Sequence, residues 1–220
     1  MHNTVKNLLY IEDLIKTKVN DLNKDKIPKI IAVSKTFPME KVLPLLEYGH
    51  LNFGENKVQE AFDKWSDIKI DLKEPKLHMI GKIQTNKAKY VVELFDYIHS
   101  LDNRKLAEKI SNEQQKKNKN LKIFIQVNIG NESQKSGITI DRLDEFYNIC
   151  TKDLNLNIVG LMCIPPNDGK PELHFDRMKK LKNTLSINEL SMGMSEDYID
   201  AIKYGSTFVR IGSKIFGERS

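Results

Sequence analysis

The sequence of 220 residues predicts an α/β fold, a (β/α)8 TIM barrel with an extra N-terminal helix. Eight short apolar runs alternate with seven longer amphipathic stretches, which is the pattern of strands connected by crossover helices. Runs such as 123–129 (IFIQVNI) and 158–164 (IVGLMCI) are apolar at successive positions, as expected for parallel strands covered on both faces. A doubly wound open sheet is the alternative, because periodicity alone does not show that a sheet closes.

The first 22 residues predict an amphipathic helix that packs on the barrel. Its apolar residues follow helical spacing and are Val5, Leu8, Leu9, Ile11 and Ile15. Glu12 and Asp13 interrupt the apolar pattern, which argues against a signal peptide and against a membrane-spanning helix. We therefore expect no membrane partner.

The rest of the chain divides into strands and helices without a Gly/Ser/Pro-rich linker, so we expect one domain over residues 1–220. The predicted strands are 30–34, 51–53, 77–80, 97–99, 122–128, 158–163, 189–191 and 207–211. The predicted helices are 40–48, 56–65, 86–94, 103–117, 139–151, 171–185 and 196–203.

Composition limits the function. The chain has 35 basic and 30 acidic residues, a mild net charge of +5, and its basic run at 116–119 (KKNK) fits a solvated helix end, so we expect no nucleic-acid partner. Its two cysteines, Cys150 and Cys163, have no nearby cysteine or suitable histidine. A disulfide framework and a zinc site are therefore not expected, and a cytoplasmic location fits best.

In a barrel of this kind, chemistry sits on the loops that follow the C-terminal ends of the strands. The first strand ends on Lys35, where partial burial lowers the pKa of an amine and frees it to attack a carbonyl as a Schiff-base nucleophile. A solvated lysine that merely ends the strand is the alternative.

Two further loops suggest a phosphate site. The loop after the seventh strand is 191–197 (SMGMSED), with Ser195 as the expected N-cap of the next helix, and the loop after the eighth is 210–213 (RIGS). Glycines let the backbone approach an anion, and helix-start N–H groups and serine hydroxyls supply donors. Ordinary helix capping is the alternative. Because the first strand adjoins the eighth, lysine and phosphate would share one pocket, as in a phosphosugar aldolase or a pyridoxal 5′-phosphate site.

Three other features border the predicted pocket. Asn56 follows the second strand and could orient a bound ring. His78 lies early in its strand, so we expect a structural histidine. The polar loop 130–137 after the fifth strand is a candidate lid.

Seven segments resemble the pyridoxal phosphate homeostasis protein family, whose members are single-domain barrels similar to the N-terminal domain of alanine racemase and to the barrel of ornithine decarboxylase. They are 32–38 (AVSKTFP), 53–60 (FGENKVQE), 78–91 (HMIGKIQTNKAKYV), 98–102 (IHSLD), 127–138 (VNIGNESQKSGI), 160–162 (GLM) and 190–219 (LSMGMSEDYIDAIKYGSTFVRIGSKIFGER).

The resemblance implies a role for each matching residue. Lys35 matches the lysine that forms the internal aldimine with pyridoxal 5′-phosphate, Asn56 lies over the cofactor, and Arg210 points toward the pyridine nitrogen. The first phosphate loop would comprise Ser191, Met192, Gly193 and Ser195, and the second Gly212 and Ser213. Because arginine does not readily give up a proton, the ring nitrogen would stay unprotonated, and the cofactor would be a weaker electron sink.

Some positions depart from the family pattern. They are Phe37, Lys82 and the segment 163–166 (CIPP), which lie beside Lys35 or in loops. These departures affect the expected rim of the pocket and leave the expected aldimine and phosphate contacts in place.

The expected function is therefore intracellular cofactor homeostasis: a monomer that holds pyridoxal 5′-phosphate as an exchangeable Schiff base on Lys35, without turnover, with pyridoxal-phosphate-dependent apoenzymes as candidate recipients. An amino-acid racemase or decarboxylase is the first alternative. Racemases of this barrel type need a second acid/base from another domain or subunit, and the sequence shows neither an extra domain nor an evident tyrosine. A Schiff-base aldolase on a phosphosugar is the second alternative, although it leaves Arg210 unexplained.

Overall fold

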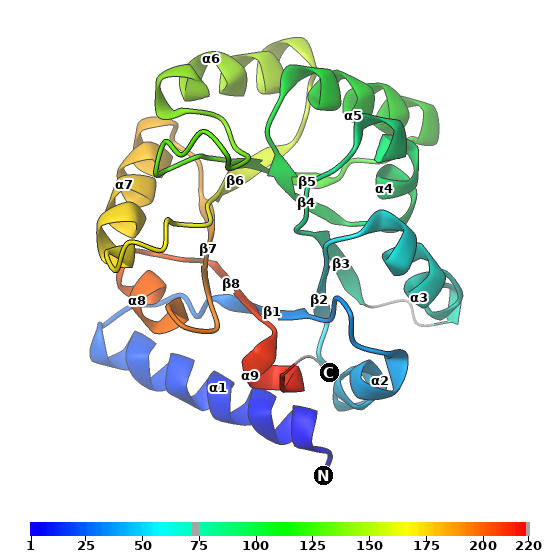
Figure 1. Cartoon of the computed structure of the whole chain (residues 1–220), viewed down its shortest axis with the longest axis vertical. Coiled ribbons are helices and arrows are strands. Elements are labelled where there is room, and N and C mark those ends of the chain that lie inside the picture. Colours follow the sequence, from blue (N-terminus) through cyan, green and yellow to red (C-terminus); the bar gives the residue numbers. More distant parts are fainter. Residues whose placement is uncertain (72–74, 219–220) are drawn as a thin grey trace.

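The computed structural model describes residues 1–71 and 75–218, which form a closed barrel of parallel strands, β1 to β8 in chain order (Figure 1). The strands are β1 (Lys29–Val33), β2 (Asn52–Glu55), β3 (Lys76–Met79), β4 (Tyr97–Leu101), β5 (Lys122–Gln126), β6 (Ile158–Met162), β7 (Glu189–Met194) and β8 (Phe208–Ile211). β1 pairs with β8 as well as with β2, which closes the sheet. The predicted (β/α)8 barrel is confirmed, and the open-sheet alternative is wrong.

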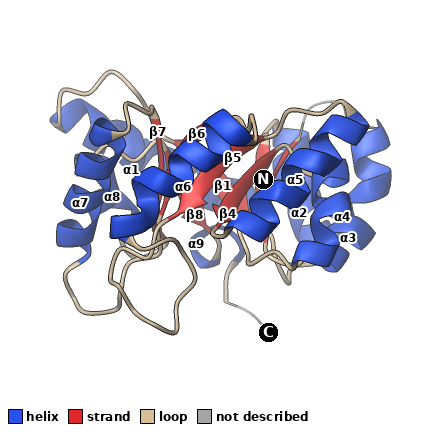
Figure 2. Cartoon of the chain, turned by 90° about the horizontal axis from the view of Figure 1, so that it is seen from above, coloured by secondary structure: helices blue, strands red, loops and turns tan. Residues whose placement is uncertain are grey.

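Helices surround the strands, as the view from above shows (Figure 2). They are α1 (Asn3–Asp21), α2 (Met39–Tyr48), α3 (Val58–Asp71), α4 (Ala88–Leu94), α5 (Arg104–Lys117), α6 (Leu143–Asn148), α7 (Pro171–Thr184), α8 (Tyr198–Lys203) and α9 (Ser213–Phe216). The predicted helix 139–151 is not one regular helix, because a 3-10 turn precedes α6 and a π-helical turn (Ile149–Asp153) follows it.

The strands are apolar on both faces because each face meets a separate core. A large cluster fills the space between the strands and the helices. A smaller cluster lies apart from it and comprises Ile31, Val33, Tyr97, Phe124, Met162 and Phe208. Successive side chains along a strand alternate between the two clusters, as in β1, where Ile30 and Ala32 join the larger cluster and Ile31 and Val33 the smaller one.

The N-terminal helix forms as predicted and lies across the outside of the barrel, against α2, α8 and α9 (Figure 1). The apolar face of the helix is buried, with Val5, Leu8, Ile11 and Ile15 on it. α9 has only four residues, and α1 packs directly on it, with Asn7 Nδ2 donating to the Ile215 carbonyl at 3.0 Å. α1 therefore covers apolar surface that the short last helix leaves open.

The charged and thiol side chains noted in the sequence have ordinary surroundings. The basic run 116–119 is at the C-terminal end of α5, where Lys116 pairs with Glu113 and Lys117 with Glu93. Both cysteines are buried as free thiols. In the described part of the chain, no helix is long and apolar enough to cross a membrane, and no group of three or more His, Cys, Asp or Glu side chains could hold a metal ion.

Candidate functional site

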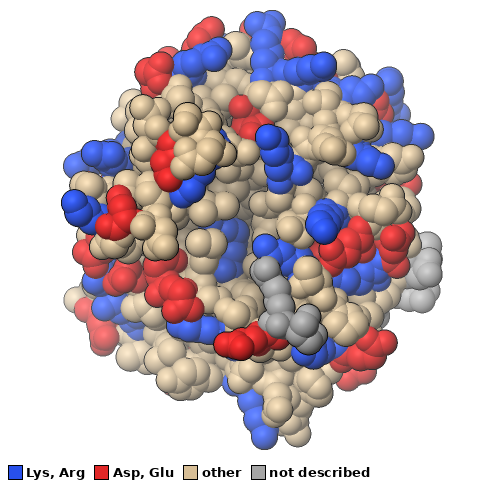
Figure 3. All heavy atoms as spheres, in the orientation of Figure 1, with Lys and Arg blue, Asp and Glu red and all other residues tan. Residues whose placement is uncertain are grey.

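The C-terminal ends of the strands surround a pocket of about 1030 Å³. Six of the residues that line it are Lys35, Asn56, Ser195, Arg210, Gly212 and Ser213, all of them predicted site residues. Figure 3 shows basic side chains in and around the central hollow of this face, where Lys82 and Lys135 add to the positive charge. The structure thus brings a lysine, an arginine and two serines from distant parts of the sequence into one pocket, whose lining also includes the carboxylates of Glu196, Asp197 and Asp200.

Lys35 lies two residues after the end of β1 and is half-buried at the start of a tight turn. Thr36, the next residue, has a φ of 67°, in the left-handed region that β-branched residues rarely adopt. Its N–H donates to Glu60 Oε1 at 2.5 Å, and its hydroxyl donates to the Lys35 carbonyl at 2.6 Å. These bonds hold a strained turn at the base of the lysine, a kind of strain that is common at functional sites.

A buried ion pair between Lys64 on α3 and Glu55 on β2 supports the end of β1. Lys64 on α3 donates to the Ser34 carbonyl at 2.9 Å and to Glu55 Oε1 at 3.0 Å. Glu55 Oε1 also accepts from Ser34 Oγ and from Trp65 Nε1. The sequence did not point to Lys64, and Glu55, which ends β2 fully buried, could have been found as a charge that closes an apolar strand.

Arg210 on β8 is a buried cation that lines the pocket and is 5% exposed. Its Nη1 donates to the Ser191 carbonyl at 2.7 Å and to Ser191 Oγ at 2.8 Å, and its Nη2 donates to the Cys163 carbonyl at 2.8 Å. Burial lowers its pKa, yet no carboxylate among the described residues lies within 4.0 Å of it. A guanidinium has five N–H donors, so Nε and the second hydrogen of Nη2 have no partner among the described residues.

Asn56 follows β2 directly and lines the pocket. Its Oδ1 is buried without a hydrogen bond among the described residues. The loop after β3 passes so closely that a Cβ on Gly81 would lie 2.2 Å from the Asn56 carbonyl oxygen. Gly81, which the sequence analysis did not select, therefore lets β2 and β3 present Asn56 to the pocket.

The loops after β7 and β8 meet at the pocket, where Ser213 Oγ donates to Ser195 Oγ at 3.1 Å. The predicted N-cap at Ser195 is wrong, because α8 begins at Tyr198 with Asp197 as its N-cap residue. The Asp197 carboxylate accepts from the Met194 N–H at 2.6 Å, which tightens the loop and leaves Ser195 facing the pocket.

Three residues of the predicted first phosphate loop do not line the pocket. β7 extends to Met194, so Ser191, Met192 and Gly193 are strand residues, all buried. Ser191 bonds to Arg210, Met192 joins the outer core, and a Cβ on Gly193 would lie 2.7 Å from that of Ala201. These three residues therefore contact the residues around the pocket and do not line it.

The polar loop after β5 is fastened at its base. Ile138 bridges to Val127, and the Asn128 side chain bonds to both the N–H and the carbonyl of Glu132. Lys135 pairs with Glu132 at 2.7 Å and donates to the Pro165 carbonyl at 3.3 Å. The predicted lid loop therefore lies as a wall of the pocket, together with the segment after β6.

The departures from the family pattern have identifiable places. Phe37 is buried and stacks on Phe216, with ring centroids 5.0 Å apart. Lys82 is exposed at the rim, and Cys163 is buried where burial raises the pKa of its thiol to about 12. These side chains form the rim and the back of the pocket.

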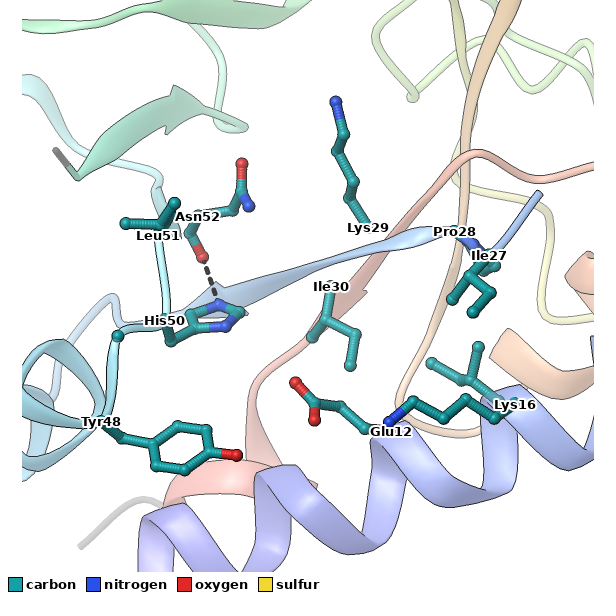
Figure 4. Close-up of a pocket in the computed structure, with 12 residues that line it drawn as sticks. Glu12, Lys16, Ile27, Pro28, Lys29, Ile30, Tyr48, His50, Leu51 and Asn52 are labelled. Atoms are coloured by element: carbon teal, nitrogen blue, oxygen red, sulfur yellow. Dashed lines mark hydrogen bonds between the residues drawn. The ribbon is translucent and has the colours of Figure 1, made fainter.

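The opposite end of the barrel has a smaller pocket of about 460 Å³, between α1 and the starts of β1 and β2. Figure 4 shows Glu12, Tyr48 and His50 pointing toward this space. Burial lowers the pKa of His50 to about 4, so its ring is neutral at pH 7. No predicted site residue lines this pocket, whereas six of them line the pocket at the C-terminal ends of the strands.

The fold and the larger pocket define a class: a (β/α)8 barrel whose pocket is lined by a lysine just after its first strand and by serines and a glycine from the loops after its last two strands. The chain belongs to the alanine racemase N-terminal domain family, whose family model matches residues 13–220. Its relatives include proteins named pyridoxal phosphate homeostasis protein. That of Vibrio alginolyticus is 40% identical, over 87% of this chain and 86% of that one, and that of Haemophilus influenzae is 37% identical, over 97% and 95%.

Solved structures agree with this membership. PipY of Synechococcus elongatus, solved without and with PLP bound, is 31% identical, with TM-scores of 0.81 and 0.79 over 92% of this chain and all of that one. An alanine racemase of Clostridium difficile is only 13% identical and matches in fold, with a TM-score of 0.73 over 98% of this chain and 56% of that one. The expected family is confirmed.

Proposed function

We propose that this chain binds pyridoxal 5′-phosphate in the pocket at the C-terminal ends of the strands and holds it as an exchangeable Schiff base on Lys35. Its role is cofactor homeostasis. The observation that carries the proposal is Arg210, a buried cation with two unpartnered donors in the same pocket as Lys35. A buried charge without an ion-pair partner is costly, and a polar ligand that accepts from it offsets that cost.

The residues present fit this cofactor. Ser195, Ser213 and Gly212 provide hydroxyls and accessible backbone for a phosphate, and Lys82 adds a cation at the rim. Arg210 supplies an N–H donor to a ring nitrogen, and Asn56 lines the pocket where its side chain can lie over the ring. The bound group supplies a reactive aldehyde, and Lys35 supplies the amine that captures it reversibly.

A carrier role fits the pocket better than catalysis does. Arg210 keeps its proton, so a ring nitrogen in contact with it stays unprotonated and the cofactor withdraws electrons weakly. Among the described residues that line the pocket, no tyrosine or histidine is present to serve as a second acid/base. The names of the relatives describe homeostasis and no reaction. Incubation with a panel of amino acids and chiral analysis should show no turnover; any catalytic turnover would overturn this part.

The visible spectrum tests covalent holding. Protein mixed with the cofactor and passed through gel filtration should elute yellow, and Lys35→Ala should elute colourless. Lys82→Ala removes a matched lysine from the rim of the same pocket and should elute yellow. A colourless wild type, or a yellow Lys35→Ala protein, would contradict the proposal.

The phosphate contact has its own test. Ser213→Ala should weaken binding of pyridoxal 5′-phosphate by about three- to tenfold, the loss of one hydrogen bond, and should leave binding of unphosphorylated pyridoxal unchanged. An equal loss of affinity for both compounds would contradict a contact between Ser213 and the phosphate.

We further propose that the protein acts as a cytoplasmic monomer that supplies pyridoxal-phosphate-dependent apoenzymes. Two buried free thiols support a reducing compartment. Sedimentation of the holoprotein should give a mass near 25.4 kDa, and a dimer mass would contradict the monomer.

A further inference from the structure

A chain of hydrogen bonds crosses the interior of the barrel from the pocket to the opposite end. Arg210 Nη1 lies 2.8 Å from Ser191 Oγ, Ser191 Oγ lies 2.9 Å from His99 Nδ1, and His99 Nε2 lies 2.9 Å from His78 Nδ1. His78 Nε2 lies 3.1 Å from Asn52 Oδ1 at the start of β2. Neither histidine lines the pocket, so neither touches a ligand there.

The rings of both histidines stack on aromatic neighbours. His78 stacks on Tyr97 with centroids 4.2 Å apart and planes at 13°, and His99 stacks on Phe124 at 4.3 Å and 13°. Both histidines are fully buried. The buried, stacked position of His78 agrees with the expected structural histidine. A structural role alone does not explain why its ring belongs to a continuous chain of hydrogen bonds that ends at Arg210.

The donors and acceptors at the two ends determine the direction of the chain. Arg210 only donates, so Ser191 Oγ accepts from it. The Asn52 oxygen only accepts, so His78 carries its proton on Nε2, which leaves His78 Nδ1 to accept from His99 Nε2. His99 Nδ1 then accepts from the Ser191 hydroxyl. Burial lowers the pKa of His99 well below its usual value, and the positive charge of Arg210 lowers it further.

We propose that His99 and His78 are positioning residues for Arg210: both are neutral with the proton on Nε2, and through Ser191 they fix the guanidinium so that its unpartnered donors face the cofactor. The Ser191 hydroxyl gives its hydrogen to His99, which keeps an oxygen lone pair directed at Nη1. The part of the inference that concerns the cofactor rests on the proposed function.

The protonation states can be measured without any ligand. In ¹⁵N NMR spectra of the ligand-free protein at neutral pH, both histidines should show a protonated Nε2 and an unprotonated Nδ1. A proton on Nδ1 of either ring would overturn the proposed direction. This result is independent of cofactor binding, so it separates failure of the chain from failure of the proposed function.

Two substitutions of His99 separate positioning from packing. Both His99→Asn and His99→Gln lose the stacking on Phe124. The asparagine amide is at the level of Nδ1 and can accept from Ser191, whereas the glutamine amide is at the level of Nε2 and reaches toward His78. Binding of pyridoxal 5′-phosphate should stay within about twofold for His99→Asn and weaken about tenfold for His99→Gln. Equal effects of the two variants would overturn the proposal.

A double-mutant cycle tests the route through Ser191. Ser191→Ala should weaken cofactor binding as His99→Gln does, and the double variant should be no weaker than either single variant. Phe124→Leu, the control, disturbs the ring that stacks on His99 and should lower stability without changing affinity. Additive effects in the cycle, or weaker binding by Phe124→Leu, would assign the histidines a packing role only.

Discussion

The substitution Arg210→Gln tests whether Arg210 contributes mainly to cofactor binding or mainly to the stability of the fold. Gln removes a charge-assisted donor whose loss from a cofactor contact should weaken binding by about 1.5–3 kcal/mol, or about 10- to 150-fold. In the ligand-free protein the effects oppose each other. Gln abandons three hydrogen bonds, to two carbonyls and the Ser191 hydroxyl, but it also removes a desolvation penalty of several kcal/mol for the buried cation. The free energy of unfolding without cofactor should therefore change by no more than about 2 kcal/mol.

Two measurements on the same variant test this reasoning. Absorbance titration with pyridoxal 5′-phosphate gives the affinity, and urea denaturation of the ligand-free protein gives the free energy of unfolding. A variant that binds the cofactor as tightly as wild type but loses more than about 4 kcal/mol of stability would refute it, because such a loss marks a structural network.

Three further predictions concern stability, each measured by urea denaturation. Gly193→Ala should destabilise by at least about 2 kcal/mol, since it combines a φ of 91° with a contact at 2.7 Å, while Gly169→Ala, with a φ of 72° and open space, should lose only about 1 kcal/mol; equal losses would contradict the contact. Lys64→Met should cost about 3–5 kcal/mol, because it leaves Glu55 buried without its cation; a loss below about 1 kcal/mol would show that the pair is dispensable. His50 binds its proton more weakly folded than unfolded, so stability should fall by about 3 kcal/mol as the pH drops from about 6.5 to about 4, and His50→Phe should remove that part; an unchanged slope in the variant would exclude His50 as the cause.

The barrel could be predicted from the sequence because its signal is local. Each strand is a short apolar run and each crossover is amphipathic, and the count of eight units favours the closed sheet that the β1–β8 pairing shows. Lys35, Gly212 and Ser213 could be predicted in the same way, since the end of a strand fixes their place in the mouth of the barrel.

The remaining features depend on side-chain direction and on contacts between distant strands. β7 extends to Met194, and Ser191 accepts a hydrogen bond from Arg210, so β7 lines the pocket only from Met194 onward. α8 begins after Asp197, whose carboxylate accepts from the Met194 N–H and tightens the preceding loop, and residue preferences alone do not distinguish this start from one after Ser195. The contact between His78 and His99 depends on the relative register of β3 and β4, which spacing along the chain does not determine.

Peptide mapping after borohydride reduction tests the central claim most directly. Reduction of the holoprotein fixes a Schiff base permanently, and mass spectrometry of the digest locates it. Modification of the peptide that contains Lys35, in proportion to the colour lost, is the predicted result. Modification of Lys82, Lys135 or another lysine with Lys35 untouched would contradict the assignment of Lys35 as the residue that holds the cofactor.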